Sequence, residues 1–267
     1  MFTIEVAAVV DKGRRKTNDD RALVEGNILD GEFYESSTVI PAVVAVCDGC
    51  GGYKGGGVAA QTILDELRKY PADSLANQEE LALALEECRR QVYAQKEKYP
   101  EYSEMCSTIA GCVFAENSVV IFHAGDSRVY RFDGEYFSQL TLDHSKQRML
   151  IDAGILSAQD AKDFREKNVI TRCIGRNCKP PEITISNLTI CPGETYLICS
   201  DGFWGSVTEE EITEALLKNI SVGEKAEQLA DMALDNGSKD NVTVCLCSRQ
   251  GDNISASTYE TEDYFLD

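Results

Sequence analysis

The sequence is poor in positive charge. Its 267 residues include 26 Lys and Arg against 45 Asp and Glu, which gives a formal net charge of 26 − 45 = −19 at pH 7. A chain this acidic has no general attraction for phosphate backbones or for anionic lipid headgroups, so we expect neither nucleic-acid nor membrane binding. An anionic substrate would therefore need local positive charge or a metal ion to hold it.

Long hydrophobic runs are also missing. One of the longest, residues 39–47, is about half of the roughly 20 residues that a bilayer-spanning helix needs. The first ten residues carry Glu5 and no basic region of the kind that opens a signal peptide. Several of the 11 cysteines lie inside apolar runs, which favours buried thiols in a reducing compartment. We therefore expect a soluble protein of the cytoplasm.

Signatures of other phosphate and metal chemistry are absent. The glycine-rich segment 48–57 lacks the Gly-Lys-Ser/Thr ending of a phosphate-binding P-loop. No cysteine is followed six residues later by arginine, which excludes a thiol-based phosphatase with a Cys-x5-Arg loop. The pair Cys47 and Cys50 has Cys-x-x-Cys spacing, but no second such pair exists, so redox chemistry or half of a zinc site is only an alternative interpretation.

Short β-branched runs recur along the whole chain and alternate with amphipathic segments. Consecutive runs without an intervening helix, as between 119 and 132, favour antiparallel pairing and an α+β class. The first 250 residues contain no linker and no break in composition, so we expect them to form a single domain. An acidic, mobile tail is expected at 251–267. The predicted strands are 4–10, 22–24, 38–47, 119–123, 128–132, 184–188, 195–199 and 242–247. The predicted helices are 56–69, 78–98, 145–164, 208–219 and 223–236. Asn77, Ser157 and Thr208 each precede a carboxylate by three residues, which is the capping-box spacing that marks a helix start.

Five aspartates, Asp20, Asp48, Asp126, Asp201 and Asp240, lie at the ends of predicted strands. A single aspartate there is most simply a turn residue that caps its own backbone. If the strand ends converge, however, five like charges persist in a poorly solvated place only when cations compensate them. Hard oxygen ligands without nearby histidine or cysteine pairs favour Mg²⁺ or Mn²⁺ over Zn²⁺, and two such ions can activate water for displacement at phosphorus.

Seven short motifs occur in a fixed order along the chain. They are RKTNDD at 15–20, DGCGG at 48–52, CST at 106–108, GDSR at 125–128, LTLDHS at 140–145, SDGFW at 200–204 and SKDNVT at 238–243. Each motif is weak alone, but the ordered set is specific. Together they resemble the metal-dependent type 2C protein serine/threonine phosphatases, also called PPM-type, and their compact bacterial members in particular. The resemblance covers residues 5–247.

The resemblance implies a fold and a set of roles. The fold is a β-sandwich of two antiparallel sheets flanked by helices, with a metal cleft at one end. Two Mn²⁺ or Mg²⁺ ions would activate a bridging water or hydroxide that hydrolyses phosphoserine and phosphothreonine monoesters. The implied ligands are Asp48 as the bridge, the Gly49 carbonyl, Asp20 with Asp19, and the pair Asp201 and Asp240. Asp126 with Asp201 would hold a weaker third ion, and Arg15 would bind the substrate phosphate through two parallel hydrogen bonds.

One departure from the family leaves the general acid open. Many eukaryotic relatives carry histidine after the Asp-Gly pair, where this chain has Cys50, and a neutral thiol is a poor substitute. A metal-associated water is our first candidate and His144 the second. The resemblance also implies phosphorylated proteins as partners, with a serine/threonine kinase and its substrates among them, and we expect a monomer. A catalytically silent relative and a metal-dependent phosphatase of small molecules are the alternative functions.

Overall fold

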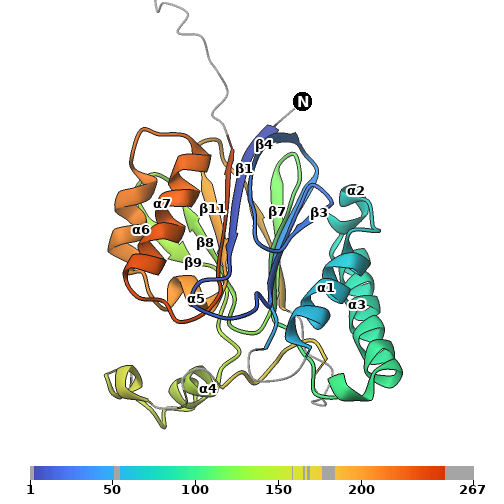
Figure 1. Cartoon of the computed structure of the whole chain (residues 1–267). Helices are drawn as coiled ribbons and strands as arrows, with labels where there is room; N and C mark the ends of the chain where they lie inside the picture. The colour runs from blue at the N-terminus through green and yellow to red at the C-terminus, as the bar shows by residue number, and fades with distance from the viewer. Residues whose placement is uncertain are drawn as a thin grey trace, which may run out of the picture.

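Two antiparallel sheets of six strands each stack face to face, as the computed structural model shows (Figure 1). The structure describes residues 3–50, 55–157, 159–164, 166, 169–175 and 184–249. The predicted tail at 251–267 and residues 51–54 of the glycine-rich segment lie outside the described residues.

The first sheet has the order β4-β1-β12-β11-β8-β9 and the second has the order β10-β7-β6-β5-β2-β3. All of their pairings are antiparallel, so the predicted fold class, a sandwich of two antiparallel sheets flanked by helices, is confirmed. The strands are β1 (Thr3–Asp11), β2 (Asp20–Val24), β3 (Asn27–Leu29), β4 (Phe33–Val39), β5 (Ala42–Asp48), β6 (Ile109–Phe114), β7 (Ser118–Ala124), β8 (Arg128–Phe132), β9 (Phe137–Gln139), β10 (Thr184–Thr189), β11 (Thr195–Cys199) and β12 (Val242–Arg249).

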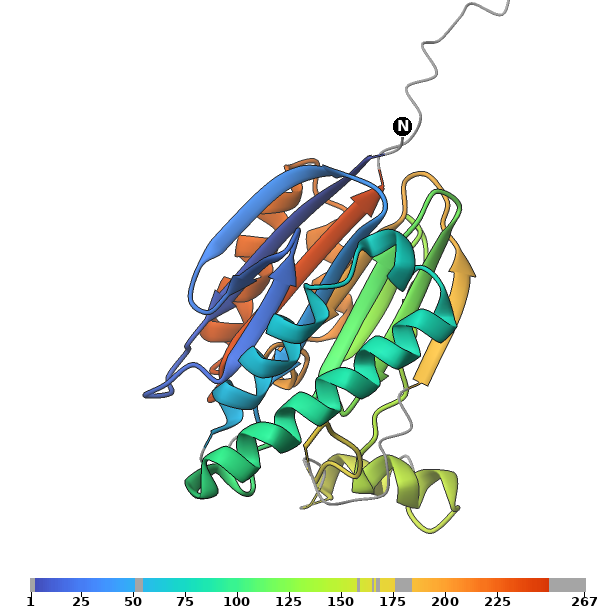
Figure 2. The same ribbon diagram turned by 90° about the vertical axis from the view of Figure 1, so that its right-hand side faces the viewer.

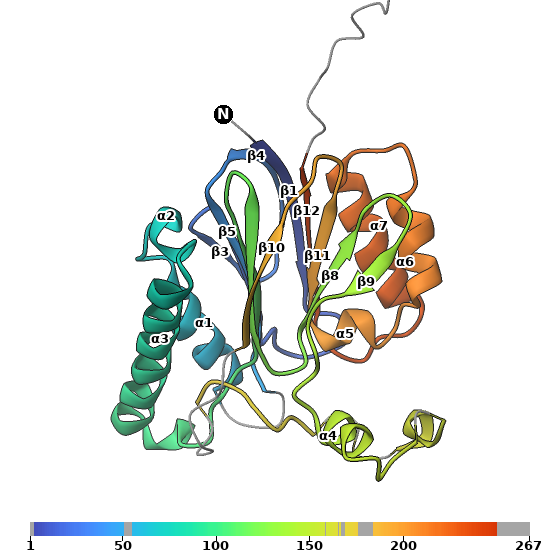
Figure 3. The same ribbon diagram turned by 180° about the vertical axis from the view of Figure 1, so that it is seen from behind.

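Helices cover the outer face of each sheet. In Figure 2, α1 and α3 lie across the second sheet, and Figure 3 shows α6 and α7 against the first. The α-helices are α1 (Gly56–Leu67), α2 (Ala72–Leu75), α3 (Gln78–Lys98), α4 (Lys146–Asp152), α5 (Asp201–Trp204), α6 (Glu209–Leu216) and α7 (Val222–Asp235), and the 3₁₀ turns are η1 (Pro100–Tyr102) and η2 (Asp160–Asp163). Within the described residues, no helix is both long and apolar enough to span a bilayer.

The central strands are buried on both faces because sheet lies on one side of them and helix on the other. All six residues of β6 are buried, and they alternate between two cores: Cys112 and Phe114 face the other sheet, whereas Ile109 and Val113 face α1 and α3. Between the sheets, Phe114 of β6 meets Tyr196 of β11 edge to face, with ring centroids 5.5 Å apart. This pair joins the two sheets through their shared apolar core.

Two of the three predicted helix starts are real side-chain caps. Thr208 and Glu211 form a complete capping box at α6, and the Asn77 side chain accepts hydrogen bonds from the first turn of α3. The Ser157 hydroxyl accepts the Asp160 amide at 3.1 Å, but Asp160 begins only the short η2 turn, whose N-cap residue is Gln159. The capping pattern therefore located the starts of α3 and α6 correctly, whereas the helix start predicted at Ser157 was wrong.

The single helix predicted at 145–164 was wrong. Helix α4 ends at Asp152, Gly154 follows with a φ of +68°, and η2 begins at Asp160. A left-handed glycine ends a helix because it turns the chain out of the helical path. The strand predicted at 38–47 was also wrong as one unit, since Pro41, which has no amide hydrogen to donate, separates β4 from β5.

We predict that Phe114→Ala destabilises the protein by about 3 to 5 kcal/mol, because it empties a fully buried site between the sheets and removes the contact with Tyr196. Urea unfolding of the metal-free protein measures the change. Leu83→Ala, at an α3 position that is 65% exposed, should stay within about 0.5 kcal/mol of the original chain. Equal effects of the two substitutions would contradict this account of the core.

Candidate active site

Two of the predicted aspartates lie side by side in the second sheet. Asp20 is the first residue of β2 and Asp48 the last residue of β5, and the two are cross-strand partners. Directly opposed residues of an antiparallel pair have β-carbons about 5 Å apart. The position of Asp48 is held by Thr108, whose amide donates to the Asp48 carbonyl at 2.9 Å and whose hydroxyl accepts the Asp48 amide at 3.0 Å.

The first sheet supplies the other two acids of this cluster. Asp201 follows β11 and begins the single-turn helix α5, and Asp240 comes two residues before β12. A hydrogen bond links the two sheets directly at this point, because the Thr243 hydroxyl of β12 donates to Asp20 Oδ2 at 2.7 Å. The two sheets thus converge where these four carboxyl groups meet, which is the condition that the strand-end pattern left open.

Burial and mutual repulsion disfavour the ionised forms of Asp20, Asp48 and Asp201. Burial raises the pKa of Asp20 to about 7, with contributions from the charges of Asp201 and Asp240 and opposition from hydrogen bonds of Ser200 and Thr243. Burial and the neighbouring acids raise the pKa of Asp48 as well. The pKa of Asp201 is raised by burial and by Asp240, although its hydrogen bond with Asp48 opposes the rise. Such a donor set fits divalent cations, which would relieve both the repulsion and the lost hydration.

Asp126 lies in the turn between β7 and β8, and its Oδ1 is a buried acceptor without a hydrogen-bond partner in the described residues. Burial and then the charge of Asp201 raise the pKa of Asp126. Its backbone is fixed by Trp204, whose indole nitrogen donates to the Asp126 carbonyl at 2.9 Å. A buried carboxylate oxygen without a hydrogen-bond partner, in a side chain close to other acids, is again suited to a cation.

Sequence reasoning missed the support beneath Asp126. The guanidinium of Arg128 lies 3.5 Å from the centre of the Trp204 ring and forms two parallel hydrogen bonds to Asp143, at 2.9 and 2.7 Å. Arg128, Asp143 and Trp204 all fall within the recognised motifs, so the sequence contained the residues. Their contacts span three separate segments, and no spacing rule predicts them.

Gly49 packs too closely for any side chain. A β-carbon there would lie 2.2 Å from the Gly56 carbonyl carbon and 2.7 Å from the Asp19 carbonyl oxygen. Asp19 itself turns toward the start of α1, where its Oδ1 accepts the Gly57 amide at 3.1 Å. The structure therefore brings Asp19 next to the cluster through its backbone while its carboxylate caps α1.

Asn241 fixes the loop that carries Asp19 and Arg15. Its side chain accepts the Asp19 amide at 2.9 Å and donates to the carbonyls of Lys12 and Thr17 at 2.8 and 3.0 Å. Asn241 was part of a recognised motif, but its role could be read only from the structure.

Arg15 stands at the rim of a pocket of about 700 Å³ that Asp201, Trp204 and Asp240 also line. Its guanidinium donates to Asp240 Oδ2 at 2.6 Å and to the Lys239 carbonyl at 3.1 Å. The side chains of Arg15 and Asp240 are 46% and 39% exposed, so this ion pair contributes little to stability and leaves the arginine free to turn toward an anion.

His144 is built into the turn that carries Asp126. Its Nδ1 accepts the Gly125 amide at 3.1 Å, and its backbone amide donates to the Gly125 carbonyl at 2.8 Å. The ring stacks on His123 with centroids 4.5 Å apart, and burial together with the His123 and Arg172 charges lowers the pKa of His144 to about 3. His144 is therefore neutral near pH 7, which favours a positioning role.

Cys47 and Cys50 do not form a common site. Cys47 faces the helix-side core of the second sheet, whereas Cys50 lies in a separate cluster with Cys106 and Cys173. The redox or zinc alternative drawn from their Cys-x-x-Cys spacing is therefore wrong for this pair.

A sandwich whose two sheets converge on a cluster of mutually repelling carboxylates, beside a pocket lined by an arginine, is the architecture of a metal-dependent phosphoester hydrolase. A family model described as protein phosphatase 2C matches residues 31–236. This chain belongs to that family, and the resemblance inferred from the motifs is confirmed.

Relatives of known activity agree with this family. The chain is 30% identical over 246 residues to the serine/threonine phosphatase stp of Listeria innocua, covering 90% of this chain and 93% of the relative. Among solved structures, serine/threonine phosphatase Stp1 from Staphylococcus aureus superposes with a TM-score of 0.81 at 28% identity, covering 94% and 96% of the two chains. The catalytic domain of serine threonine protein phosphatase PstP, in complex with two manganese ions, gives 0.76 at 29% identity, covering 94% and 100%.

We predict that Asp20 makes the metal-free protein less stable as pH rises. Its unfolded pKa is near 3.8 and its folded pKa about 7, so between these values the folded state binds more protons and the unfolding free energy falls with increasing pH. The loss is at most on the order of 4 kcal/mol. Asp20→Asn should therefore be more stable than the original chain at pH 7.5 without metal, and this advantage should shrink at pH 4.5.

Urea unfolding of metal-free protein at the two pH values measures this difference. Asp231→Asn, at an exposed position of α7, is the matched control and should leave the pH dependence unchanged. A pH dependence in Asp20→Asn identical to that of the original chain would show that Asp20 is not the group responsible.

Proposed function

We propose that this protein is a serine/threonine protein phosphatase that hydrolyses phosphoserine and phosphothreonine monoesters with two Mn²⁺ or Mg²⁺ ions. The observation that carries the proposal is the convergence of Asp20, Asp48, Asp201 and Asp240 from two sheets, with raised carboxyl pKa values for the first three. The family membership and the manganese-bound structure of PstP support the same reading.

The proposed ligands are the clustered acids and the Gly49 carbonyl. Asp48 stands between the acids of the two sheets and would bridge two ions, with the Gly49 carbonyl beside it. Asp201 and Asp240 would complete one ion from the first sheet, and Asp20 with Asp19 would hold the other from the second sheet. Asp126, with its unpartnered oxygen near Asp201, would contribute to a weaker third site.

The ions, when bound, would supply an activated water nucleophile and neutralise charge on the phosphoryl oxygens. The protein's own contribution is to bind and orient. Arg15 can leave Asp240 and give two parallel N–H donors to a phosphate at the rim of the pocket, a geometry that lysine lacks. Trp204 donates a hydrogen bond to the Asp126 carbonyl and lines the same pocket, so it connects Asp126 to the pocket where the phosphate would bind.

The leaving serine or threonine oxygen also needs a proton. We propose that it comes from water in the cleft rather than from His144. Support comes from the His144 ring, whose Nδ1 is occupied as the acceptor of the Gly125 amide and whose pKa is lowered to about 3. His144 would then act as a positioning residue for the Gly125–Asp126 turn.

We propose phosphorylated proteins as substrates, with a serine/threonine kinase and its targets among them, and a monomer acting in the cytoplasm. A single domain over residues 1–250 with an acidic tail at 251–267 remains part of this proposal. A silent scaffold is disfavoured because buried, mutually repelling acids lower the stability of the metal-free protein and bring it no benefit without ions.

We predict that Asp201→Asn lowers kcat for a phosphothreonine peptide by about 100-fold or more, because it removes a ligand whose ion contributes several kcal/mol to the transition state. The activity of the original chain should require Mn²⁺ or Mg²⁺ and stop with EDTA. Asp231→Asn should keep full activity. Full activity in Asp201→Asn would disprove the proposed site.

Mn²⁺ calorimetry on the same variants separates binding from chemistry. A silent scaffold would show no tight ion binding in the original chain. Turnover of phosphopeptides compared with nucleotides and sugar phosphates tests the alternative of a small-molecule phosphatase, which a preference for the small esters would favour.

We predict that Arg15→Lys lowers kcat/KM by about 10- to 100-fold, because lysine cannot replace two parallel charged hydrogen bonds. Arg14→Lys, at the neighbouring exposed position, is the matched control and should change kcat/KM little. Mn²⁺ affinity should be similar in both variants. An unchanged kcat/KM in Arg15→Lys would remove Arg15 from the phosphate site.

A further inference from the structure

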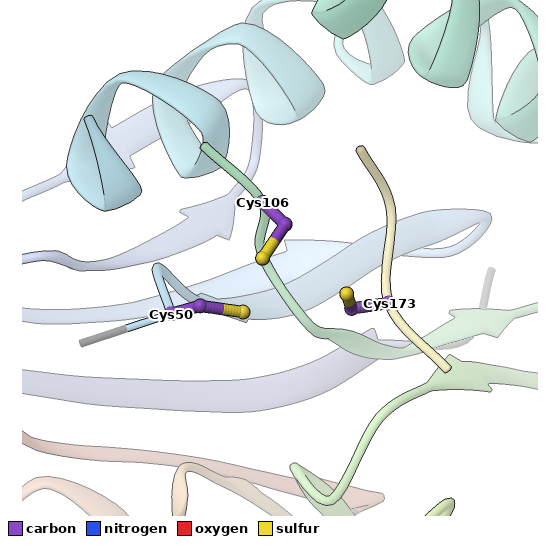
Figure 4. A group of neighbouring side chains, drawn as sticks. All are labelled: Cys50, Cys106 and Cys173. Carbon is purple, nitrogen blue, oxygen red and sulfur yellow. The ribbon is translucent and has the colours of Figure 1, made fainter. Parts of the chain in front are cut away.

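Three cysteines from distant parts of the chain converge beside the carboxylate cluster. The sulfur atoms of Cys50, Cys106 and Cys173 all lie within 4.8 Å of one another, and in Figure 4 their side chains approach from three separate segments. Cys50 is 8% exposed and the other two are 1% exposed. Among the residues that the structure describes, the three form an apolar cluster of their own, and the partly buried Ile170 packs against it.

Main-chain pairing holds the three segments together. Gly49 bridges to Ser107, and Ser107 bridges to Ile174, so each cysteine neighbours a residue of a small three-stranded ladder. The Cys50 amide donates to the Cys106 carbonyl at 2.9 Å, and Ser107 and Ile174 exchange hydrogen bonds of 3.0 and 2.9 Å. The relative positions of the thiols are therefore set by the backbone.

The thiols lie close enough together to share one ion. A Zn–S bond is about 2.3 Å, so three sulfurs around one tetrahedral ion lie about 3.8 Å apart. The three sulfur atoms lie within 4.8 Å of one another, so they would move closer together when they bind the ion. Soft thiolate ligands select Zn²⁺ and similar ions, whereas the nearby carboxylates select Mg²⁺ and Mn²⁺.

We propose that Cys50, Cys106 and Cys173 form a binding site for one thiophilic cation, Zn²⁺ or its chemical analogue Cd²⁺, distinct from the carboxylate site. Three thiols bind the ion as thiolates and release three protons to solvent, which gives a complex of net charge −1. A solvent molecule or small ligand takes the fourth position. The site does not depend on the proposed phosphatase activity.

An ion in this site would cross-link the segment that follows Gly49 to two other segments of the ladder. Cys50 is the residue next to Gly49, so the cross-link fixes the chain directly behind the carboxylate cluster. Since the ion binds the folded arrangement and not the separated segments, it raises the melting temperature of the protein.

The test uses Cd²⁺ added to the full-length chain, reduced under anaerobic conditions, with Mn²⁺ in excess to occupy the carboxylates. We expect one Cd²⁺ per chain, an ultraviolet thiolate-to-cadmium charge-transfer band, and loss of that band when Zn²⁺ is added. Cys106→Ala and Cys173→Ala should each weaken Cd²⁺ binding at least about tenfold. Cys88→Ala, at a buried cysteine outside the cluster, is the matched control and should leave the band and the affinity unchanged.

A second measurement avoids substitutions altogether, in case a variant does not fold. The ¹¹³Cd resonance of the unaltered chain should lie in the downfield region of sulfur-coordinated cadmium, and the melting temperature should rise on Cd²⁺ addition. No charge-transfer band, a resonance of oxygen-coordinated cadmium, or equal binding in Cys106→Ala, Cys173→Ala and the control would each overturn the proposal.

Discussion

The structure depends on the placement of like-charged aspartates where the two sheets converge. Asp20 and Asp48 oppose each other across one sheet, while Asp201 and Asp240 reach them from the other. Burial removes hydration from Asp20, Asp48 and Asp201, and the charges of all four carboxylates repel, so the cluster opposes folding when no cation is present. The hydrogen bond from Thr243 to Asp20 joins the sheets at the very point where repulsion would separate them.

The apolar part of the fold offsets this local penalty. Strands buried on both faces, such as β6, place one row of side chains between the sheets and another beneath α1 and α3. Because the side-chain period of a strand is two, a slip of one residue would exchange the two rows, so register is tightly specified. That register puts Asp20 opposite Asp48 and Asp48 beside Thr108. Core packing thus positions a site that is itself unfavourable for folding.

Local sequence patterns predicted a good part of this molecule. Strand-end position singled out five aspartates, and the structure brings Asp20, Asp48, Asp201 and Asp240 together with Asp126 beside them. Capping oxygens located helix starts because they satisfy neighbouring amides without help from the rest of the fold. The helix predicted at 145–164 failed because Gly154 ends it at a position where amphipathic periodicity continues. β3 and β9, at three residues each, were too short to show any periodicity.

What sequence could not supply was contact between distant segments. Arg128 stacks on Trp204 and donates hydrogen bonds to Asp143. Cys50 packs with Cys106 and Cys173, which are distant in sequence, and not with the nearby Cys47. Asp48 meets hard oxygen donors, and two residues later Cys50 meets soft sulfur donors. Two residues that are only two positions apart would therefore bind different cations. The hard carboxylate of Asp48 prefers Mg²⁺ or Mn²⁺, and the soft thiolate of Cys50 prefers Zn²⁺ or Cd²⁺.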